Sequence, residues 1–286
     1  MATLKQIRSR IRTAKNIQQI TRAMKLVAAA RLKRATDRVL QARPYSEKLR
    51  GFMQSLAAGG ELPPHPLLQR PEAIERYTLI LITAERGLCG SYNTNLLRRA
   101  SEFLAQQEGE PTLITVGKKG TQFFAKRGYD IVHSHTLPTS GARIADAVEI
   151  AQIARRMFEE GETDAIFVCY SKFFSAIRQV PQVVQLLPIE PPEQAADSAA
   201  IEFAFEPDAA TLLDTLLPRY FLSLVWQALL EATASEHGAR MSAMTSATDN
   251  AGKMIQTLTL KANRERQAGI TKEILEVVGG AEALKA

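Results

Sequence analysis

LKQIRSRIRTAKNIQQITRAMKLVAAA, residues 4–30, carries apolar side chains at a spacing of three or four residues on an otherwise basic and polar segment. These positions are Leu4, Ile7, Ile11, Ala14, Ile17, Ile20, Met24 and Val27. They form one stripe along a helix, which is the pattern of a helix that pairs with another helix. A capping pattern at Thr3 and Gln6 marks its start, and Gly59-Gly60 ends it. We therefore predict a long coiled-coil helix within residues 1–60.

The C-terminal end of the chain offers a partner for this helix. Its apolar residues also recur at helical spacing, at Met241, Met244, Met254, Leu258, Ile270, Ile274 and Val277. Residues 212–230, by contrast, are apolar on most sides, which predicts burial against a middle domain. The helix is expected to begin near Pro218, since proline suits a first helical turn. Residues 208–286 are thus predicted to pair with residues 1–60 as an antiparallel coiled coil.

Aromatic residues separate these two ends from the middle of the chain. All eighteen of them, eleven Phe, six Tyr and one Trp, lie between Tyr45 and Trp226. A globular core uses large rings, whereas the seam between two helices favours aliphatic and small side chains. The composition therefore predicts a slender helical pair joined to one globular domain.

Short β-rich runs alternate with helical segments in the middle of the chain. The expected strands are residues 77–82, 112–116, 130–132, 165–170 and 180–187. The expected helices are residues 93–107, 118–127 and 142–160, and residues 188–198 are expected to form a surface loop. This alternation predicts an open, Rossmann-like α/β sheet with helices on both faces, over residues 72–206.

Charge is unevenly distributed over the 286 residues. Residues 1–50 contain fourteen Lys and Arg against two acidic residues, a balance of +12, so the remainder carries −6 of a net charge of +6. A basic helix indicates an acidic partner, which can be nucleic acid, anionic lipid or acidic protein loops. The segment lacks aromatic rings that could stack on bases, but a nucleic-acid-binding coiled-coil protein stays open as an alternative.

Few motifs indicate catalysis. Residues 117–121, GKKGT, lack the spacing of a phosphate-binding P-loop, and residues 85–91, ERGLCGS, fit a tight turn that leaves Arg86 exposed. His133 and His135 are expected on one face of a strand, and a surface pair is favoured because the sequence places no third metal ligand nearby. We expect no catalytic, cofactor-binding or metal site, although a small-molecule enzyme built on the α/β domain is a second alternative.

Several long segments resemble the gamma subunit family of rotary F-type ATP synthases. They are IRSRI at 7–11, KNI at 15–17, ITRAMKLVAAA at 20–30, ERGLCGSYN at 85–93, ARMSAMTSATDN at 239–250 and NRERQAGITKEILEVVGGAEAL at 263–284. The resemblance implies a central rotor shaft that couples transmembrane proton or other ion flow to ATP synthesis by turning inside the alpha–beta hexamer. It implies a non-catalytic subunit that regulates ATPase activity and ion flow and needs no cofactor.

The same resemblance implies the partners and the location. The helical pair would contact the alpha and beta subunits, and the α/β domain would lie beside the epsilon subunit and the c-subunit ring, with one copy per complex and no nucleic acid. The chain would be peripheral, at the cytoplasmic face of a bacterial plasma membrane, and associated with it through the complex. No segment between Cys169 and Phe205 resembles the regulatory insertion of the photosynthetic members, so thiol control is not expected.

Contact positions of the family carry over to this sequence one at a time. Met24 matches a methionine near acidic loops of the beta subunits, where torque is transmitted, and Arg22 and Lys25 stand beside it. Arg240 matches a position coupled to that region, and Arg86 resembles a second contact with beta.

The C-terminal positions implied by the resemblance form a further group. Arg266 and Gln267 match polar residues that touch beta-subunit loops, and Thr271 and Glu273 follow one turn later. On the side of the c ring and epsilon, the resemblance points to Phe205 and Glu206, where Phe205 lacks the hydroxyl of the tyrosine often found there.

Overall fold

The computed structural model describes residues 3–58, 63–190 and 209–283. The chain divides into two compact units, a coil unit of residues 1–27 and 241–286 and a sheet unit of residues 28–240. Two long helices, α1 (Leu4–Ala58) and α5 (Ala209–Ala283), contribute to both units. The domain limits that the sequence predicts stay predictions, because the segments would join at residues outside the described ranges.

The sheet unit is built on a mostly parallel sheet. Its strands are β1 (Arg76–Ile82), β2 (Glu110–Val116), β3 (Asp130–His135), β4 (Ala165–Phe173) and β5 (Gln179–Leu187). Within the described residues their order is β3-β2-β1-β4-β5, and only β5 is antiparallel to its neighbour. The intervening helices are α2 (Tyr92–Gln106), α3 (Lys118–Ala125) and α4 (Ile144–Glu159), after a short 3-10 helix, η1 (Pro66–Leu68). The predicted open α/β sheet is confirmed.

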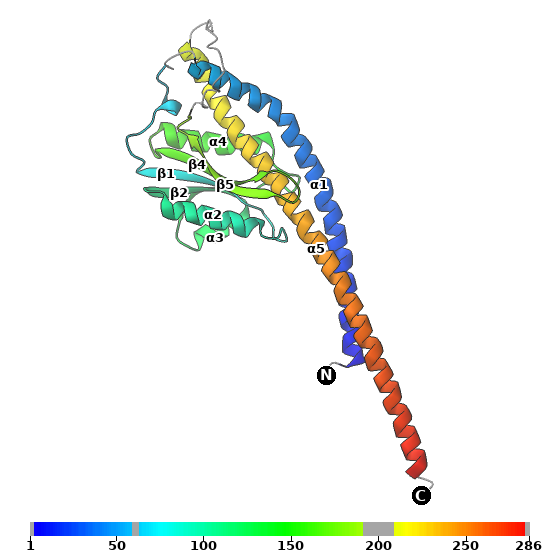
Figure 1. Cartoon of the computed structure of the whole chain (residues 1–286). Coiled ribbons are helices and arrows are strands. Elements are labelled where there is room, and N and C mark those ends of the chain that lie inside the picture. The colour runs from blue at the N-terminus through cyan, green and yellow to red at the C-terminus, as the bar shows by residue number, and fades with distance from the viewer. Residues whose placement is uncertain (1–2, 59–62, 191–208, 284–286) are drawn as a thin grey trace. The chain divides into compact units, whose positions relative to one another are not determined.

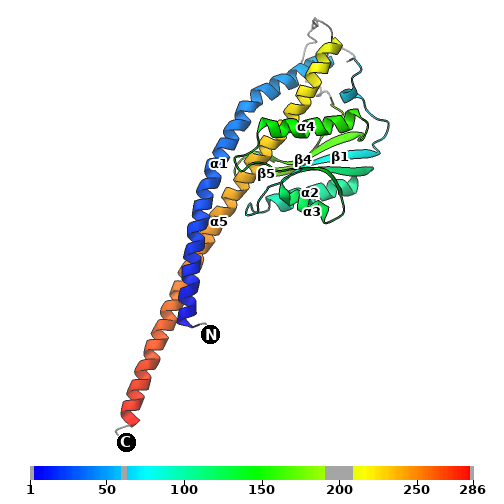
Figure 2. The same cartoon turned by 180° about the vertical axis from the view of Figure 1, so that it is seen from behind.

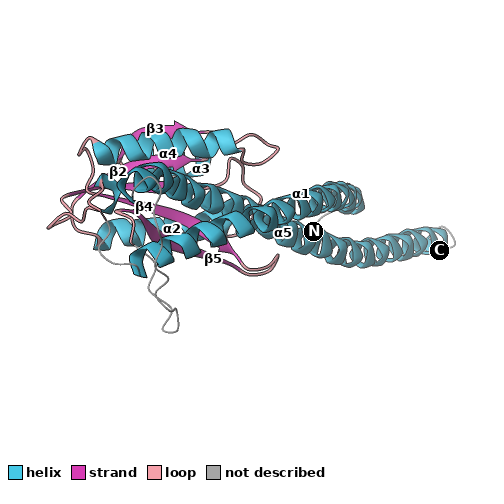
Figure 3. Cartoon of the chain, turned by 90° about the horizontal axis from the view of Figure 1, so that it is seen from above, coloured by secondary structure: helices cyan, strands magenta, loops and turns pink. Residues whose placement is uncertain are grey.

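Helices cover both faces of this sheet (Figures 1 and 3). Alternate side chains of β1 point to opposite faces, so Leu79 enters one core with Leu96 of α2, and Ile80 enters the other with Ile150 of α4. The sheet-unit part of α5 packs into the same core as α4, where Phe221 is fully buried. The burial predicted for residues 212–230 is therefore confirmed.

In the coil unit, α1 and α5 lie side by side (Figures 1 and 2). The pair is antiparallel, because Thr21 meets Thr248 while Gln18, earlier on α1, meets Gly252, later on α5. The predicted cap is present at the start of α1: the main-chain N–H of Thr3 donates to Gln6 Oε1 at 3.0 Å, and that of Gln6 donates to Thr3 Oγ1 at 3.4 Å. None of the described helices is long and apolar enough to cross a membrane.

Two predictions about the long helices were wrong in detail. The helix α5 begins at Ala209 and has Pro218 inside it, because packing against the sheet continues the helix N-terminal to the proline. The apolar stripe of α1 is also wider than its buried seam: Ile17, Ile20 and Val27 are 48%, 58% and 52% exposed. A coiled-coil seam repeats every 3.5 residues, so apolar residues chosen at spacings of three drift onto a neighbouring face.

Candidate functional site

The seam of the coil unit is narrow, and few of its residues are fully buried. Its buried positions on α1, Ile7, Ala14 and Thr21, follow one another at intervals of seven, as do Met244 and Ala251 on α5, where Ala262 is buried eleven residues later. This heptad spacing is that of a coiled coil. The hydroxyls of Thr21 and Thr248 lie 2.8 Å apart across the seam, which makes the register specific. Pairing of the two helices therefore buries only a small part of their surface.

Large apolar side chains lie outside that seam. Those exposed on α1 of the coil unit are Ile17, Ile20, Leu26 and Val27. Those exposed on α5 are Met254, Leu260, Ile270, Ile274, Leu275, Val277 and Val278. Single exposed apolar residues are ordinary on a protein surface, but a succession of them along the same helices is typical of a surface that a partner covers.

The predicted contact residues of the coil unit belong to two separate groups. Arg22 is exposed and Met24 and Lys25 are half-buried, all close to the Thr21–Thr248 bond. Arg266 and Gln267 are exposed further along α5, eighteen or more residues after Thr248, which corresponds to roughly 27 Å of helix. The structure does not bring the two groups together, so each would need its own partner surface.

The second group continues one turn along α5. Thr271 and Glu273 are exposed, and the Thr271 hydroxyl donates to the Gln267 carbonyl at 3.0 Å. Helical periodicity places Glu273 on the face of Arg266, seven residues earlier, and Thr271 on the face of Gln267. Ile270 and Ile274, four residues apart, thus lie together on one face of the exposed helix end, between these two polar pairs.

In the sheet unit, Arg86 and Arg240 are brought together although they are far apart in the sequence. The Arg240 guanidinium donates from Nη2 to the carbonyl oxygens of Arg86 and Gly87, each at 3.4 Å. Its Nη1 lies 2.7 Å from Glu236 Oε1 and 3.3 Å from His237 Nδ1. We call Glu236, His237 and Arg240, together with the turn of residues 85–91, the arginine clasp.

The electrostatics of the clasp favour a neutral histidine beside Arg240. Burial lowers the pKa of His237 to about 4, and the charges of Arg240, Arg31 and Arg34 act in the same direction. A neutral imidazole can accept the hydrogen bond from Arg240. Burial raises the pKa of Glu236, and the adjacent Arg240 partly offsets that effect. Arg240 is therefore the counter-charge that keeps a buried carboxylate in place.

The turn that the clasp holds presents two residues outward. Arg86 and Leu88 are exposed, and Leu88 has a φ of 62°, a conformation that an L side chain other than Asn or Asp rarely adopts. Cys89 beneath them is buried, and Asn93 donates to its sulfur from Nδ2 at 3.2 Å. Burial raises the pKa of the Cys89 thiol. Strained residues of this kind cluster at functional sites, which makes this exposed tip a candidate contact surface.

Sequence reasoning missed the roles of Glu236 and His237. The spacing of four residues between Glu236 and Arg240 was available as a signal of a helical ion pair. What no local pattern indicates is that Arg240 reaches a turn more than 150 residues away in the chain. Phe205 and Glu206, the positions expected on the side of the c ring, lie outside the described residues.

The glycine-containing turn at residues 117–121 does not offer free amides to a phosphate. The N–H of Gly120 donates to Thr83 Oγ1 at 2.8 Å, and that of Lys118 donates to the Glu85 carboxylate at 3.4 Å. Gly117 has a φ of 92°, and a Cβ there would overlap the Thr83 carbonyl oxygen. The glycines are explained by close packing of the turn, as the sequence indicated.

Comparison with known proteins gives a consistent result over the whole length. The chain matches the family described as ATP synthase over residues 3–284. It is 45% identical over 285 residues to the ATP synthase gamma chain of Pelotomaculum thermopropionicum and 47% identical over 291 residues to that of an Anaeromyxobacter species, with 100% of each chain covered. A chain in the structure of Euglena gracilis mitochondrial ATP synthase (OSCP, F1 and c-ring) has a TM-score of 0.75 at 20% identity, covering 98% of this chain and 94% of that one.

Proposed function

This chain belongs to the ATP synthase gamma family, the central stalk rotor of the complex, and we propose how its own residues carry that role. The coil unit turns inside the alpha–beta hexamer, and the sheet unit faces the epsilon subunit and the c-subunit ring. One copy acts per complex, without a cofactor or catalytic residues of its own. The comparisons give no support to the nucleic-acid-binding or enzyme alternatives.

The exposed apolar residues of the coil unit carry this proposal. The end of α5, with Ile270, Ile274 and Val277, has a large apolar surface and no aromatic ring, so the surrounding subunits can cover it without locking it. When the surrounding subunits cover these side chains, apolar surface is removed from water, which is favourable. A rotating element needs contacts that are extensive but weak at any single point.

Polar residues on the same unit then transmit torque. Arg22 and Lys25, beside Met24, meet acidic loops of the beta subunits, where they form charge-assisted hydrogen bonds with carboxylates. Arg266 and Gln267, with Thr271 and Glu273, form the second contact, about 27 Å along the helix. Two contact levels, one on α1 and one on α5, give the hexamer a lever against which each catalytic step can push.

The arginine clasp makes the sheet unit's contact with beta rigid. Arg240 acts as a positioning residue because its guanidinium holds the turn from which Arg86 and Leu88 project. Phe205 and Glu206 complete the proposed set on the side of the c ring and epsilon. The chain is peripheral to a bacterial plasma membrane, on its cytoplasmic face, and is held there through the complex, where it regulates ATPase activity and ion flow.

Reconstitution tests this proposal. Alpha and beta subunits are mixed with the chain, and assembly and ATP hydrolysis are compared with and without it. We expect one copy to co-elute with the hexamer and hydrolysis to depend on it. Unassembled chain, together with salt-dependent binding to DNA or RNA, would instead revive the nucleic-acid alternative.

Arg266→Ala with Gln267→Ala tests the second contact in the assembled complex. Truncating a contact pair of this kind costs about 1–2 kcal/mol, so we expect roughly a tenfold loss of coupled turnover with nucleotide binding intact. Arg98→Ala with Gln106→Ala, two exposed residues of α2, is the matched control. Coupled turnover equal to that of the control would remove the proposed role of this pair.

A further inference from the structure

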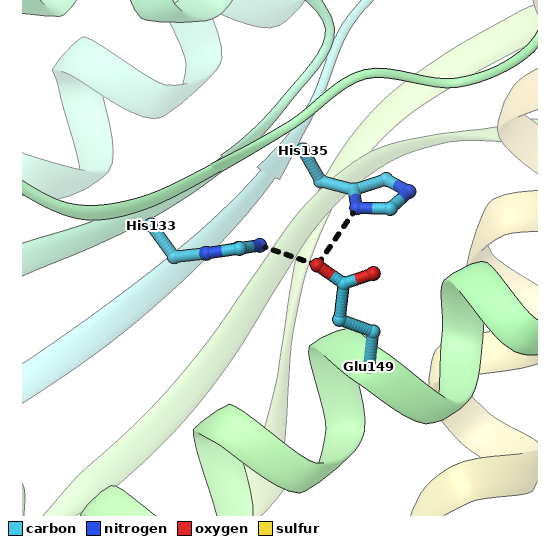
Figure 4. Close-up of side chains that lie close together, drawn as sticks. All are labelled: His133, His135 and Glu149. Atoms are coloured by element: carbon cyan, nitrogen blue, oxygen red, sulfur yellow. Dashed lines mark ion pairs between the residues drawn. The ribbon is translucent and has the colours of Figure 1, made fainter.

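Two histidines and a glutamate converge between the edge strand β3 and helix α4 (Figure 4). His133 and His135 lie two residues apart on β3, so both imidazoles stand on the same face of the sheet. Glu149 comes from α4, which packs over that face, and its carboxylate points at both rings. The sequence did not reveal this third residue, because Glu149 is fourteen or more positions away in the chain.

Distances within the cluster match those between ligands of a tetrahedral metal ion. Glu149 Oε1 lies 3.3 Å from His133 Nε2 and 3.4 Å from His135 Nδ1, and the three ligand atoms lie within 4.8 Å of one another. Zinc binds histidine nitrogen and carboxylate oxygen at about 2.0–2.1 Å, which puts neighbouring ligand atoms about 3.3 Å apart in a tetrahedron. Two of the three separations already have this value.

Asp146 fixes the orientation and the tautomer of His135. Its Oδ1 lies 3.2 Å from His135 Nε2, and Asp146 is itself held by Arg143, whose main-chain N–H donates to Oδ2 at 2.7 Å. With the proton on Nε2, the lone pair of Nδ1 faces Glu149 Oε1. A carboxylate behind a ligating histidine is the usual second layer of a zinc site.

The inner atoms of the cluster are not all joined by hydrogen bonds. His133 Nε2 is buried and has no hydrogen-bond partner among the described residues, although Glu149 Oε1 is only 3.3 Å away. His135 Nδ1 and Glu149 Oε1 are two acceptors that face each other. A cation placed among these three atoms satisfies all of them, whereas a buried nitrogen such as His133 Nε2 left unpaired is costly.

We propose that His133 Nε2, His135 Nδ1 and Glu149 bind one divalent transition metal ion, of which Zn²⁺ is the best fit. Two imidazoles and a carboxylate are a ligand set that zinc accepts, with water in the fourth position. The Glu149 side chain is 49% exposed, which provides the entry path. The ion would join the edge strand β3 to α4. This site is independent of the rotor role and of the contacts proposed for it.

Cobalt(II) titration of the full chain, prepared without a histidine tag and freed of metal by a chelator, tests the site. Tetrahedral Co²⁺ bound to nitrogen and oxygen absorbs in the visible range, and a thiolate band would betray binding by Cys89 or Cys169 instead. We expect one Co²⁺ per chain, no thiolate band, and displacement by one equivalent of Zn²⁺. Zinc should also raise the melting temperature of the chain, since it binds the folded state.

His133→Ala and Glu149→Gln are the deciding variants, and Glu102→Gln, an exposed carboxylate on α2, is the matched control. We expect each deciding variant to bind at least about tenfold more weakly, by analogy with the loss that follows disturbance of a zinc site, and the control to bind as the unaltered chain does. Circular dichroism without metal checks that each variant folds. If His133→Ala does not fold, metal binding by Glu149→Gln alone decides the test. Equal binding by all variants, or no binding by the unaltered chain, would overturn the proposal.

Discussion

The coil unit and the sheet unit bury their apolar residues in opposite ways. In the sheet unit, strand residues enter cores on both faces, and the rings of Tyr77, Phe103 and Phe167 pack with centroids 4.9–6.1 Å apart. In the coil unit, the buried seam takes one small or medium residue in seven, and large apolar side chains such as Ile274 and Leu275 remain exposed. The first unit buries its rings and strand residues in cores of its own, although some apolar side chains such as Ile177 stay exposed, whereas the second buries few large apolar side chains without partners.

This difference separates residues that stabilise the chain from residues that are free to bind. Removing a methylene from the sheet core opens a cavity, and its cost appears in the isolated chain. Removing one from the exposed end of α5 costs the isolated chain almost nothing, and its cost appears in the complex. The same substitution made in each unit therefore tests the distinction.

Leu79→Ala against Leu275→Ala makes that test with one chemical change. Leu79 is fully buried and Leu275 is 65% exposed. We expect Leu79→Ala to lower the free energy of unfolding by about 3 kcal/mol and Leu275→Ala to change it by less than about 0.5 kcal/mol. Urea denaturation followed by the fluorescence of Trp226, which lies in the sheet unit, measures the loss of stability caused by Leu79→Ala. Similar losses for both leucines would break the comparison.

Arg240→Met should have the next largest effect. It leaves the carboxylate of Glu236 buried beside His237 without its counter-charge, and we expect a loss of about 2 kcal/mol in the free energy of unfolding. Adding Glu236→Gln should recover part of the loss, because the uncompensated charge is then removed. A double variant no more stable than Arg240→Met would show that Arg240 acts through the turn at residues 85–91 alone.

His237 gives the sheet unit a pH dependence of a defined sign. Its pKa of about 4 in the folded chain lies below the ordinary value of 6.5, so between these values the unfolded chain binds a proton that the folded chain does not. Stability from this group is complete above pH 6.5 and falls as the pH drops towards 4, by about 1.5 kcal/mol between pH 6.5 and pH 5.

Comparison with His237→Gln isolates this contribution. His65, whose pKa burial also lowers, acts in the same direction and is retained in both proteins. Glu236, whose pKa is raised, acts with the opposite sign. We expect the unaltered chain to lose more stability than His237→Gln over this range in urea denaturation. Parallel losses would mean that His237 is charged in the folded chain.

The sequence predicted the architecture well because the periods of strands and of helices can both be read from short stretches of the chain. Alternation of strand and helix patterns and the lack of rings at the ends were sufficient for the sheet and the helical pair. The seam was predicted less well: Ile17, Ile20 and Val27 keep a spacing of three and seven residues among themselves, but they lie one position out of register with the seam of Ile7, Ala14 and Thr21. Apolar residues for a partner and for the seam look alike in the sequence, and only the paired helix separates them.

The sequence predicted candidate sites well where all their residues are close together in the chain, and poorly where they come from distant elements. Arg86 was expected at an exposed tip from its turn alone, and the structure confirms that exposure. The clasp from Arg240 and the convergence of Glu149 on two histidines both depend on elements distant in the sequence. The partner roles of Arg22, Met24, Lys25, Arg266 and Gln267 stay predictions, because they depend on surfaces of other subunits.

The most direct test of the central claim replaces Ile270, Ile274 and Val277 together by serine. We expect the free chain to unfold as before, because these side chains are exposed, while its affinity for the alpha–beta hexamer falls at least about tenfold. Ile177→Ser, an 88% exposed residue of the sheet unit, is the control and should assemble normally. Binding to the hexamer is measured by titration beside the unaltered chain. Unchanged affinity of the triple variant, with the same stability, would contradict the claim that this end of α5 is a surface for partners.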